Sequence, residues 1–110
     1  MGFFKTMLRM NTACLGKASG SGFNGCYVGL AKKDNAPALM IFGTSLKEDY
    51  IFNKDDIENV EVIGSGRELG TGNKMTSVTK YKLTFKDGKT VLCSIDQNGR
   101  LTSNFDAIIF

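Results

Sequence analysis

The chain has 110 residues, of which 42% are hydrophobic, and its formal net charge is +3. A chain of this length and composition is expected to form one globular domain around a single core, which excludes global disorder. The small positive charge does not indicate nucleic-acid binding, and no apolar run approaches the roughly 20 residues of a membrane-spanning helix.

Histidine is absent, and the three cysteines stand far apart in the sequence. The absence of histidine excludes the Ser-His and Cys-His nucleophile pairs and removes the commonest zinc ligand. Cys14, Cys26 and Cys93 are odd in number and have no C-x-x-C spacing, so neither a disulfide framework nor a structural zinc site is expected. This cysteine usage is typical of a reducing compartment, so we expect a cytoplasmic protein.

The N-terminal segment, residues 1–21, is expected to be distinct from a single antiparallel β domain over residues 22–110. Across residues 2–15 the apolar side chains recur with helical periodicity, and Lys5 lies opposite them. We interpret this stretch as a short helix or an extended arm packed on the sheet; a cationic amphipathic helix lying on a membrane surface is the alternative. Residues 16–22 are rich in glycine and serine and are expected to form a flexible junction.

Strand patterns then follow one another in close order. Strands are expected over residues 23–31, 38–44, 50–52 and 59–63. The second of these is apolar on both faces, which indicates a strand inside the sheet. Asn53 is expected to cap one helical turn over residues 54–57, because its side chain can accept from the exposed backbone donors of that turn. Residues 64–76 contain four glycines and are expected to form a long irregular loop.

The clearest local signal is an Asp-Gly turn, at residues 86–88, between two alternating stretches. Two-residue and three-residue loops give different registers, and a slip of one residue moves every side chain to the other face. With the three-residue loop, Leu83 pairs with Val91 and Tyr81 with Cys93, which gathers apolar side chains on one face. We therefore expect a type I turn closed by a bulge at its glycine, with a mostly wet opposite face.

The chain ends in a short apolar segment. Ser103 followed by Asp106 forms a cap-like pair at its start. We interpret the segment as a short helix docked on the sheet, with a terminal strand as the alternative. Taken together, the patterns predict a mainly β protein of the α+β type, built on a bent antiparallel sheet or a partly open barrel.

Basic residues near the glycine-rich segment are the candidate ligand-binding residues. They are Arg67, Lys74, Lys80 and Lys82. Glycine-rich backbone and cationic side chains can bind an anion. However, the glycine spacing matches neither a P-loop nor a dinucleotide fingerprint, so no cofactor is expected. No metal site is expected either, because the carboxylates of residues 55–61 match no calcium loop.

Nucleic acid is not expected to be a partner, because aromatic and basic residues alternate along the strand before the turn. Tyr81 and Phe85 must face away from Lys80 and Lys82, so no aromatic stacking surface carries the lysines. No serine, threonine or lysine has an identifiable activating partner, and Cys93 is expected to lie inert in the core. No catalytic residue is therefore assigned.

Two stretches of the chain carry a resemblance to a known family. Residues 52–62 read as a strand, a short acidic turn and a strand that begins at valine. Residues 81–90, with their Lys-Asp-Gly-Lys turn, and the apolar segment after Ser103 stand in the order of a later hairpin and a closing helix. In these features the chain, over about residues 38–110, resembles bacterial pleckstrin-homology-like domains.

This resemblance implies a strongly bent antiparallel sheet or sheet pair that is closed at one end by the C-terminal helix. It also implies a scaffold that serves binding more often than catalysis. The chain departs from the family in three respects. The sequence indicates six strands where the family has seven, the final helix is short, and there is neither a tryptophan nor the clustered lysine-arginine signature of phosphoinositide binders.

These observations favour a small, non-enzymatic binding or scaffold module that recognises a protein or peptide, with an exposed sheet edge as the contact. The same edge offers a route to self-association. The alternative is a peripheral membrane module that binds anionic lipid through the N-terminal segment and the Lys80 and Lys82 face. A small enzyme that uses Cys93 or the acidic turn is the third hypothesis.

Overall fold

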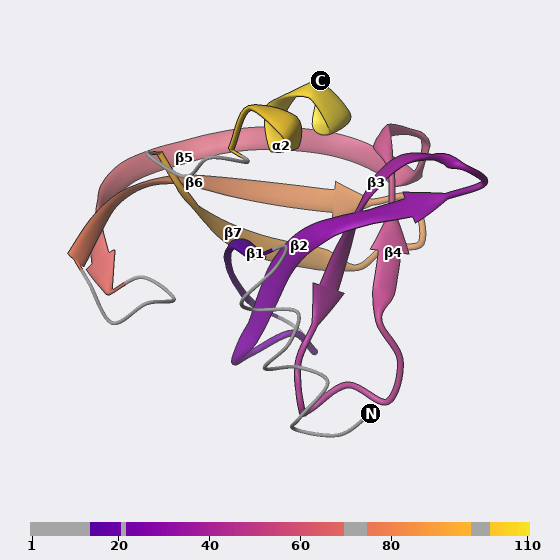
Figure 1. Ribbon diagram of the computed structural model, residues 1–110, viewed down its shortest axis with the longest axis horizontal. Helices are drawn as coiled ribbons and strands as arrows, with labels where there is room; N and C mark the ends of the chain where they lie inside the picture. The colour runs from indigo at the N-terminus through magenta and orange to yellow at the C-terminus, as the bar shows by residue number, and fades with distance from the viewer. Residues whose placement is uncertain (1–13, 21, 70–74, 98–101) are drawn as a thin grey trace.

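The protein is built on one bent antiparallel sheet. The computed structural model describes residues 14–20, 22–69, 75–97 and 102–110. Within these residues the chain forms β1 (Cys14–Ser19), β2 (Cys26–Lys33), β3 (Ala36–Phe42), β4 (Tyr50–Phe52), a 3-10 turn η1 (Lys54–Asp56), β5 (Ile57–Leu69), β6 (Met75–Phe85), β7 (Thr90–Asp96) and α2 (Thr102–Ile109). The strand order is β4-β3-β2-β1-β7-β6-β5. The sheet curves around a common interior, and α2 lies at one end of it, in contact with β3 (Figure 1). The mainly β class and the bent antiparallel sheet are therefore confirmed.

The core lies on the inner face of this sheet, and every strand and α2 contribute to it. Its buried members are Leu15, Ala18, Phe23, Cys26, Val28, Leu39, Ile41, Phe52, Ile57, Tyr81, Leu83, Phe85, Val91, Cys93, Ile95, Phe105 and Ile109. The alternation of side chains along each strand explains this arrangement, because every second residue points inward. β3 is buried on both faces over residues 38–42, and it lies between β4 and β2, which confirms its expected position inside the sheet.

The expected hairpin register is confirmed. Leu83 pairs with Val91, and Tyr81 pairs with Cys93. Gly88 has a φ of +92°, which places it in the left-handed region that the bulge requires. The N–H of Gly88 donates to the carbonyl of Phe85 at 3.0 Å, which closes the turn.

β1 is the main departure from the sequence-based expectation. Residues 14–19 pair with β2 on one side and β7 on the other, so the expected flexible junction is wrong over Gly16 to Ser19. Gly16 has a packing role there, because a Cβ at this position would overlap the carbonyl oxygen of Ser94. The folded β domain thus includes residues 14–19 as its seventh strand. The rest of the expected N-terminal helix or arm, residues 2–13, lies outside the described residues.

β5 is the second departure, because the loop expected over residues 64–76 is mostly strand. β5 continues to Leu69 and β6 begins at Met75. The pairing of the two strands extends to these two residues, which stand opposite each other. The register shifts between Val62 and Gly64, where the glycine has a φ of +154°. Glycines in a strand mark a bulge or bend, and here pairing with β6 outweighs their low strand propensity.

The other local expectations differ from the structure by a few residues at most. β4 has the expected bounds, whereas β2 begins at Cys26, after a turn, and ends at Lys33. Asn53 caps η1: its side chain accepts from the N–H of Asp55, and its own N–H donates to Asp56 Oδ2, each at 3.0 Å.

The C-terminal segment is a helix, as expected. Phe105 and Ile109 of α2 are buried in the core, and Tyr81 donates a hydrogen bond to Asp106 at 2.9 Å. The helix begins at Thr102, so Ser103 lies inside it and not at the expected cap position. In the part of the chain that the structure describes, no helix has the length and apolar character needed to cross a bilayer.

Candidate functional site

The basic residues selected from the sequence lie on the β5–β6 hairpin, and the hairpin separates them. Lys80 and Lys82 are on β6 and Arg67 is on β5, whereas Lys74 lies outside the described residues. Arg67 pairs with Ser77. Because side chains alternate along a strand, Arg67 lies on the opposite face of the hairpin from both lysines. The structure therefore brings Lys80 and Lys82 together but not Arg67.

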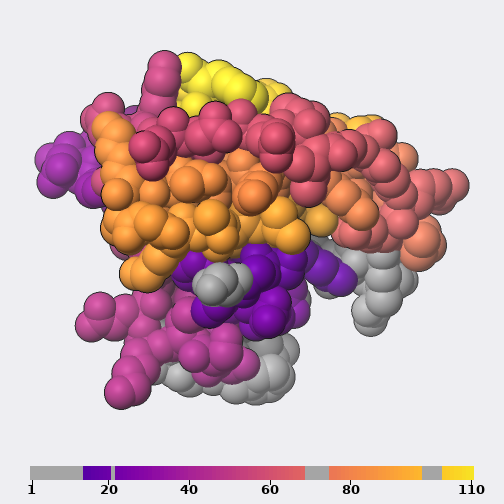
Figure 2. Space-filling model, turned by 180° about the vertical axis from the view of Figure 1, so that it is seen from behind, coloured from indigo at the N-terminus to yellow at the C-terminus, as the bar shows by residue number. Residues whose placement is uncertain are grey.

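Acidic neighbours accompany both lysines on this outer face. The ammonium of Lys80 lies 3.3 Å from the carboxylate of Glu68. Lys82 is exposed and stands opposite Glu61 on β5 and Leu92 on β7. Figure 2 shows the outer surfaces of β5, β6 and β7 side by side across one side of the molecule. This surface carries basic residues, but it is not a cluster of unopposed positive charge.

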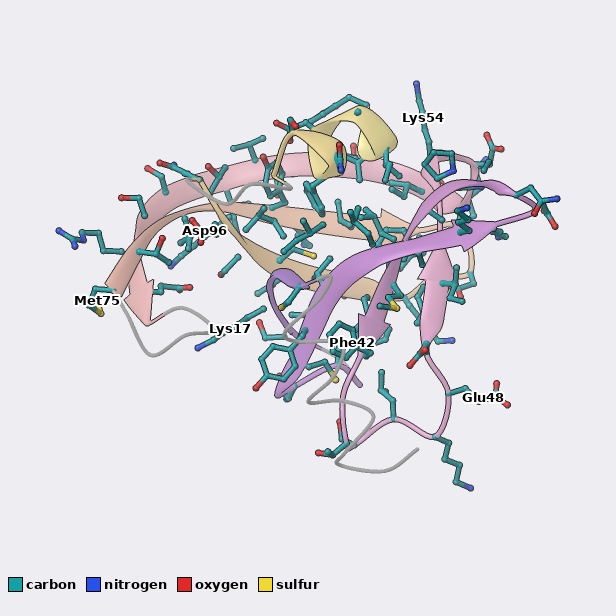
Figure 3. All side chains as sticks on the ribbon, viewed as in Figure 1. Lys17, Phe42, Glu48, Lys54, Met75 and Asp96 are labelled. Atoms are coloured by element: carbon teal, nitrogen blue, oxygen red, sulfur yellow. The ribbon has the colours of Figure 1, made fainter. Side chains whose placement is uncertain are left out.

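A hollow of about 360 Å³ adjoins the same face. It is lined by Lys17, Ala18, Ser19, Gly25, Cys26, Tyr27, Glu68 and Ser94. Lys17 lies under the bent end of the β5–β6 hairpin (Figure 3). Glu68, from the segment that the sequence suggested as a loop, forms part of the wall. The hollow is thus lined by one cationic side chain, one anionic side chain and three residues that carry hydroxyl groups.

Lys17 and Tyr27 are lining residues that the sequence did not single out. They stand opposite each other in the pairing of β1 with β2, and Lys17 also stands opposite Ser94 of β7. The glycine-rich surroundings of Lys17 gave no strand signal, so its place in the sheet could not be read from local pattern.

The long edge strand β5 is the other conspicuous surface. β5 has 13 residues, and among the described residues it pairs with β6 alone. Near its middle, Val62 and Ile63 are exposed to 57% and 47%. The opposite edge of the sheet is β4, with only three residues. An unpaired edge presents a row of backbone donors and acceptors, and this one also presents apolar side chains.

Cys93 and the acidic turn, the two groups on which the enzyme hypothesis depends, lie in the part of the chain that the structure describes. Cys93 is 1% exposed, and burial raises the pKa of its thiol to about 12, so the reactive thiolate is disfavoured at neutral pH. In the acidic turn, Asp56 accepts a hydrogen bond from Lys33 at 2.7 Å, which holds the pKa of its carboxyl below the usual range. Within the described ranges, no three His, Cys, Asp or Glu side chains are grouped so that they could hold a metal ion.

Comparison with known proteins gives no relative from which function could be inferred. No protein-family model, no curated protein and no solved structure matches this chain.

Proposed function

We propose that the chain is a non-enzymatic binding module that recognises an extended segment of a protein partner at the edge of β5. The observation that carries this proposal is the exposure of Val62 and Ile63 in the middle of a long strand whose second edge has no partner strand among the described residues. An extended peptide that adds to such an edge gains main-chain hydrogen bonds, and its alternate side chains give specificity.

The composition of β5 supports a binding role. Soluble proteins protect their edges with proline, lysine, short strands or bulges. β5 has two register shifts and three glutamates, Glu58, Glu61 and Glu68, but neither proline nor lysine. The edge is therefore only partly protected, as is expected where pairing with another chain is useful.

We also propose that the scaffold is pleckstrin-homology-like. Three features support this: the strand count of seven that the resemblance implies, the strong bend of the sheet, and the position of α2 at one end. The seventh strand is β1, which removes one of the departures noted from the sequence.

The membrane alternative has less support. The ammonium of Lys80 is already close to Glu68, and Lys82 faces Glu61 across the strand pair. Each acidic neighbour weakens the attraction of this face for anionic lipid, since attraction to a charged surface depends on unopposed basic residues.

The proposal is tested by selecting displayed random peptides on the full chain and mapping the best binder by hydrogen exchange. We expect bound peptide to slow exchange of the β5 amides. The double variant Val62→Lys, Ile63→Lys should bind the same peptide at least roughly tenfold more weakly, because charge is placed on the pairing edge.

Leu92→Lys provides the matched control. Leu92 is also exposed, but it lies on β7, which has a partner strand on each side and therefore no free edge. This variant should bind the peptide as the wild type does. Protection confined to another surface would overturn the edge assignment. Failure to select any peptide, combined with retention on phosphatidylserine vesicles at low salt, would favour the membrane module.

A further inference from the structure

A second pocket lies away from β5, where three loops of the sheet meet. Its volume is about 300 Å³, and it is lined by Gly22, Phe23, Leu46, Glu48, Asp49, Tyr50 and Lys89. These residues come from the turn before β2, the loop that leads into β4 and the hairpin between β6 and β7. The pocket shares no residue with β5.

The floor of the pocket is a fixed aromatic ring. The Tyr50 ring lies 5.5 Å from that of Phe23 in an edge-to-face arrangement and 4.9 Å from that of Phe85. The hydroxyl of Tyr50 donates to Asp87 Oδ2 at 2.8 Å. Packing and this hydrogen bond together hold the ring in one orientation, so a ligand would meet a preorganised surface.

The ring of Tyr50 already attracts a cation. The ammonium of Lys89 lies 5.2 Å from the ring centroid, which is within the range of a cation–π interaction. The same ammonium lies 3.6 Å from Asp87, and the Lys89 side chain is 57% exposed. A largely exposed lysine can leave this position at little cost, since exposed ion pairs and cation–π contacts are weak.

Acidic residues form part of the pocket and its surroundings. Glu48 and Asp49 line the pocket, and Asp87 adjoins it through Tyr50. Figure 3 shows Glu48 on the loop that leads into β4, with its side chain directed outward. Leu46 and Phe23 supply apolar wall between the acidic rim and the core. An apolar wall, an aromatic face and a carboxylate rim together suit a side chain with an aliphatic stem and a cationic head.

We propose that this pocket binds an arginine side chain of a protein partner. The stem would lie against Leu46 and Phe23, and the guanidinium would stack on the Tyr50 ring and pair with Glu48. Arginine fits better than lysine, because its planar head stacks on aromatic rings, is weakly hydrated and can pair with a carboxylate through two hydrogen bonds. Lys89 then acts as an internal competitor that occupies the ring until the arginine arrives.

The test is a titration of the isotope-labelled full chain with the tripeptide acetyl-Gly-Arg-Gly-amide at low salt, followed by NMR. We expect weak, saturable shifts at the amides of Gly22, Leu46 and Glu48. The citrulline tripeptide, which keeps the shape but lacks the charge, should not shift them. Equal shifts with citrulline or with the lysine tripeptide would overturn the assignment to arginine.

Two variants with opposite expected effects sharpen the test. Glu48→Gln should weaken binding roughly threefold to tenfold through loss of one charge-assisted contact. Lys89→Met should tighten binding roughly twofold to fivefold, because it removes the competing cation.

Lys86→Met is the matched control, because it removes one positive charge from the same hairpin at an exposed residue that does not line the pocket. Its affinity should stay close to that of the wild type. Equal tightening by Lys86→Met and Lys89→Met would show that net charge, not the pocket, governs binding. Because β5 takes no part, this result and that of the edge experiment are independent.

Discussion

Gly16 controls how closely β1 approaches β7, because its α-carbon lies against the backbone of Ser94 and Ile95. Gly66 differs from Gly16, because a Cβ added at Gly66 would have no neighbour within 4 Å. Gly16 therefore has a packing role that Gly66 does not share.

We expect Gly16→Ala to lower the free energy of unfolding by about 2 kcal/mol or more, because the new methyl group must push two paired strands apart. Urea denaturation followed by circular dichroism measures this change. Gly66→Ala is the control and should change stability by less than about 0.5 kcal/mol. Equal stability of Gly16→Ala and wild type would contradict the close approach.

Asp56 links two parts of the chain through its charge. It accepts from the backbone of Asn53 and from the ammonium of Lys33, and its pKa lies below the usual range. A carboxyl whose pKa is lower in the folded state stabilises the fold above its unfolded pKa. This contribution is lost as the pH falls through the folded pKa.

Asp56→Asn should therefore cost about 1 kcal/mol near pH 7, a value typical of a lost helix cap at a partly exposed site. The difference between variant and wild type should shrink below about pH 4, as Asp56 becomes protonated in the wild type. Urea midpoints at a series of pH values measure it. Asp55→Asn, at an exposed position of the same turn, is the control and should change the urea midpoint at pH 7 very little.

At the scale of elements, α2 is fixed to the sheet by one apolar face and one hydrogen bond. The ring of Phe105 packs against that of Tyr81, with centroids 4.9 Å apart and a tilt of 52°, and the hydroxyl of Tyr81 donates to Asp106. Burial and this hydrogen bond raise the pKa of Tyr81 to about 12. A helix of eight residues is too short to be stable in isolation, so its order depends on these contacts.

Phe105→Ala should reduce the free energy of unfolding by about 3 kcal/mol, because it empties a fully buried aromatic site. Calorimetry or urea titration measures the loss. Asn104→Ala, at an exposed position of the same helix, should be nearly neutral. If both variants behaved alike, the docking of α2 would not contribute to stability.

Elements with a strong local signal could be predicted from the sequence, whereas those fixed by distant pairing could not. The hairpin register followed from the position of Gly88 and the alternation around it. β1 overlaps the glycine- and serine-rich residues 16–22, and the far half of β5 contains Gly64 and Gly66; the strand conformation of both depends on hydrogen bonds to β7 and β6. Propensity is a weak guide in such segments, because tertiary pairing overrides it.

The candidate site was predicted only in part, for a related reason. Lys80 and Lys82 lie together on the outer face, as expected. Arg67 lies on the other face, because the residues around it form a strand and not the expected loop. The pocket around Tyr50 draws residues from three separate loops. Its members come from residues 22–23, 46–50 and 89, and only the fold brings these three segments together, so no single motif in the chain could reveal the pocket.

At the scale of the whole molecule, a single core joins all strands, and two cysteines report on it. Cys26 and Cys93 are buried, whereas Cys14 is half-buried and its pKa is raised to about 11 by burial. Since Cys93 lies on a strand paired on both sides, its exposure requires large-scale opening of the sheet.

Brief alkylation with iodoacetamide, followed by peptide mapping, should leave Cys26 and Cys93 unmodified in the native protein. In urea their modification should rise in parallel with the unfolded fraction. Modification of Cys93 under native conditions, as fast as that of Cys14, would contradict its burial and would revive the hypothesis of a cysteine enzyme.

The placement of β1 between β2 and β7 also governs the order in which the protein can be assembled during synthesis. β1 leaves the ribosome before the other described strands, yet one of its two partners, β7, is among the last to emerge. Until β7 emerges, the edge of β1 that pairs with β7 in the folded protein lacks this partner. Joining strands at opposite ends of the chain carries a high loop-closure cost and is intrinsically slow. The same strand that completes the sheet therefore makes the nascent chain vulnerable to mispairing in the interval before β7 emerges.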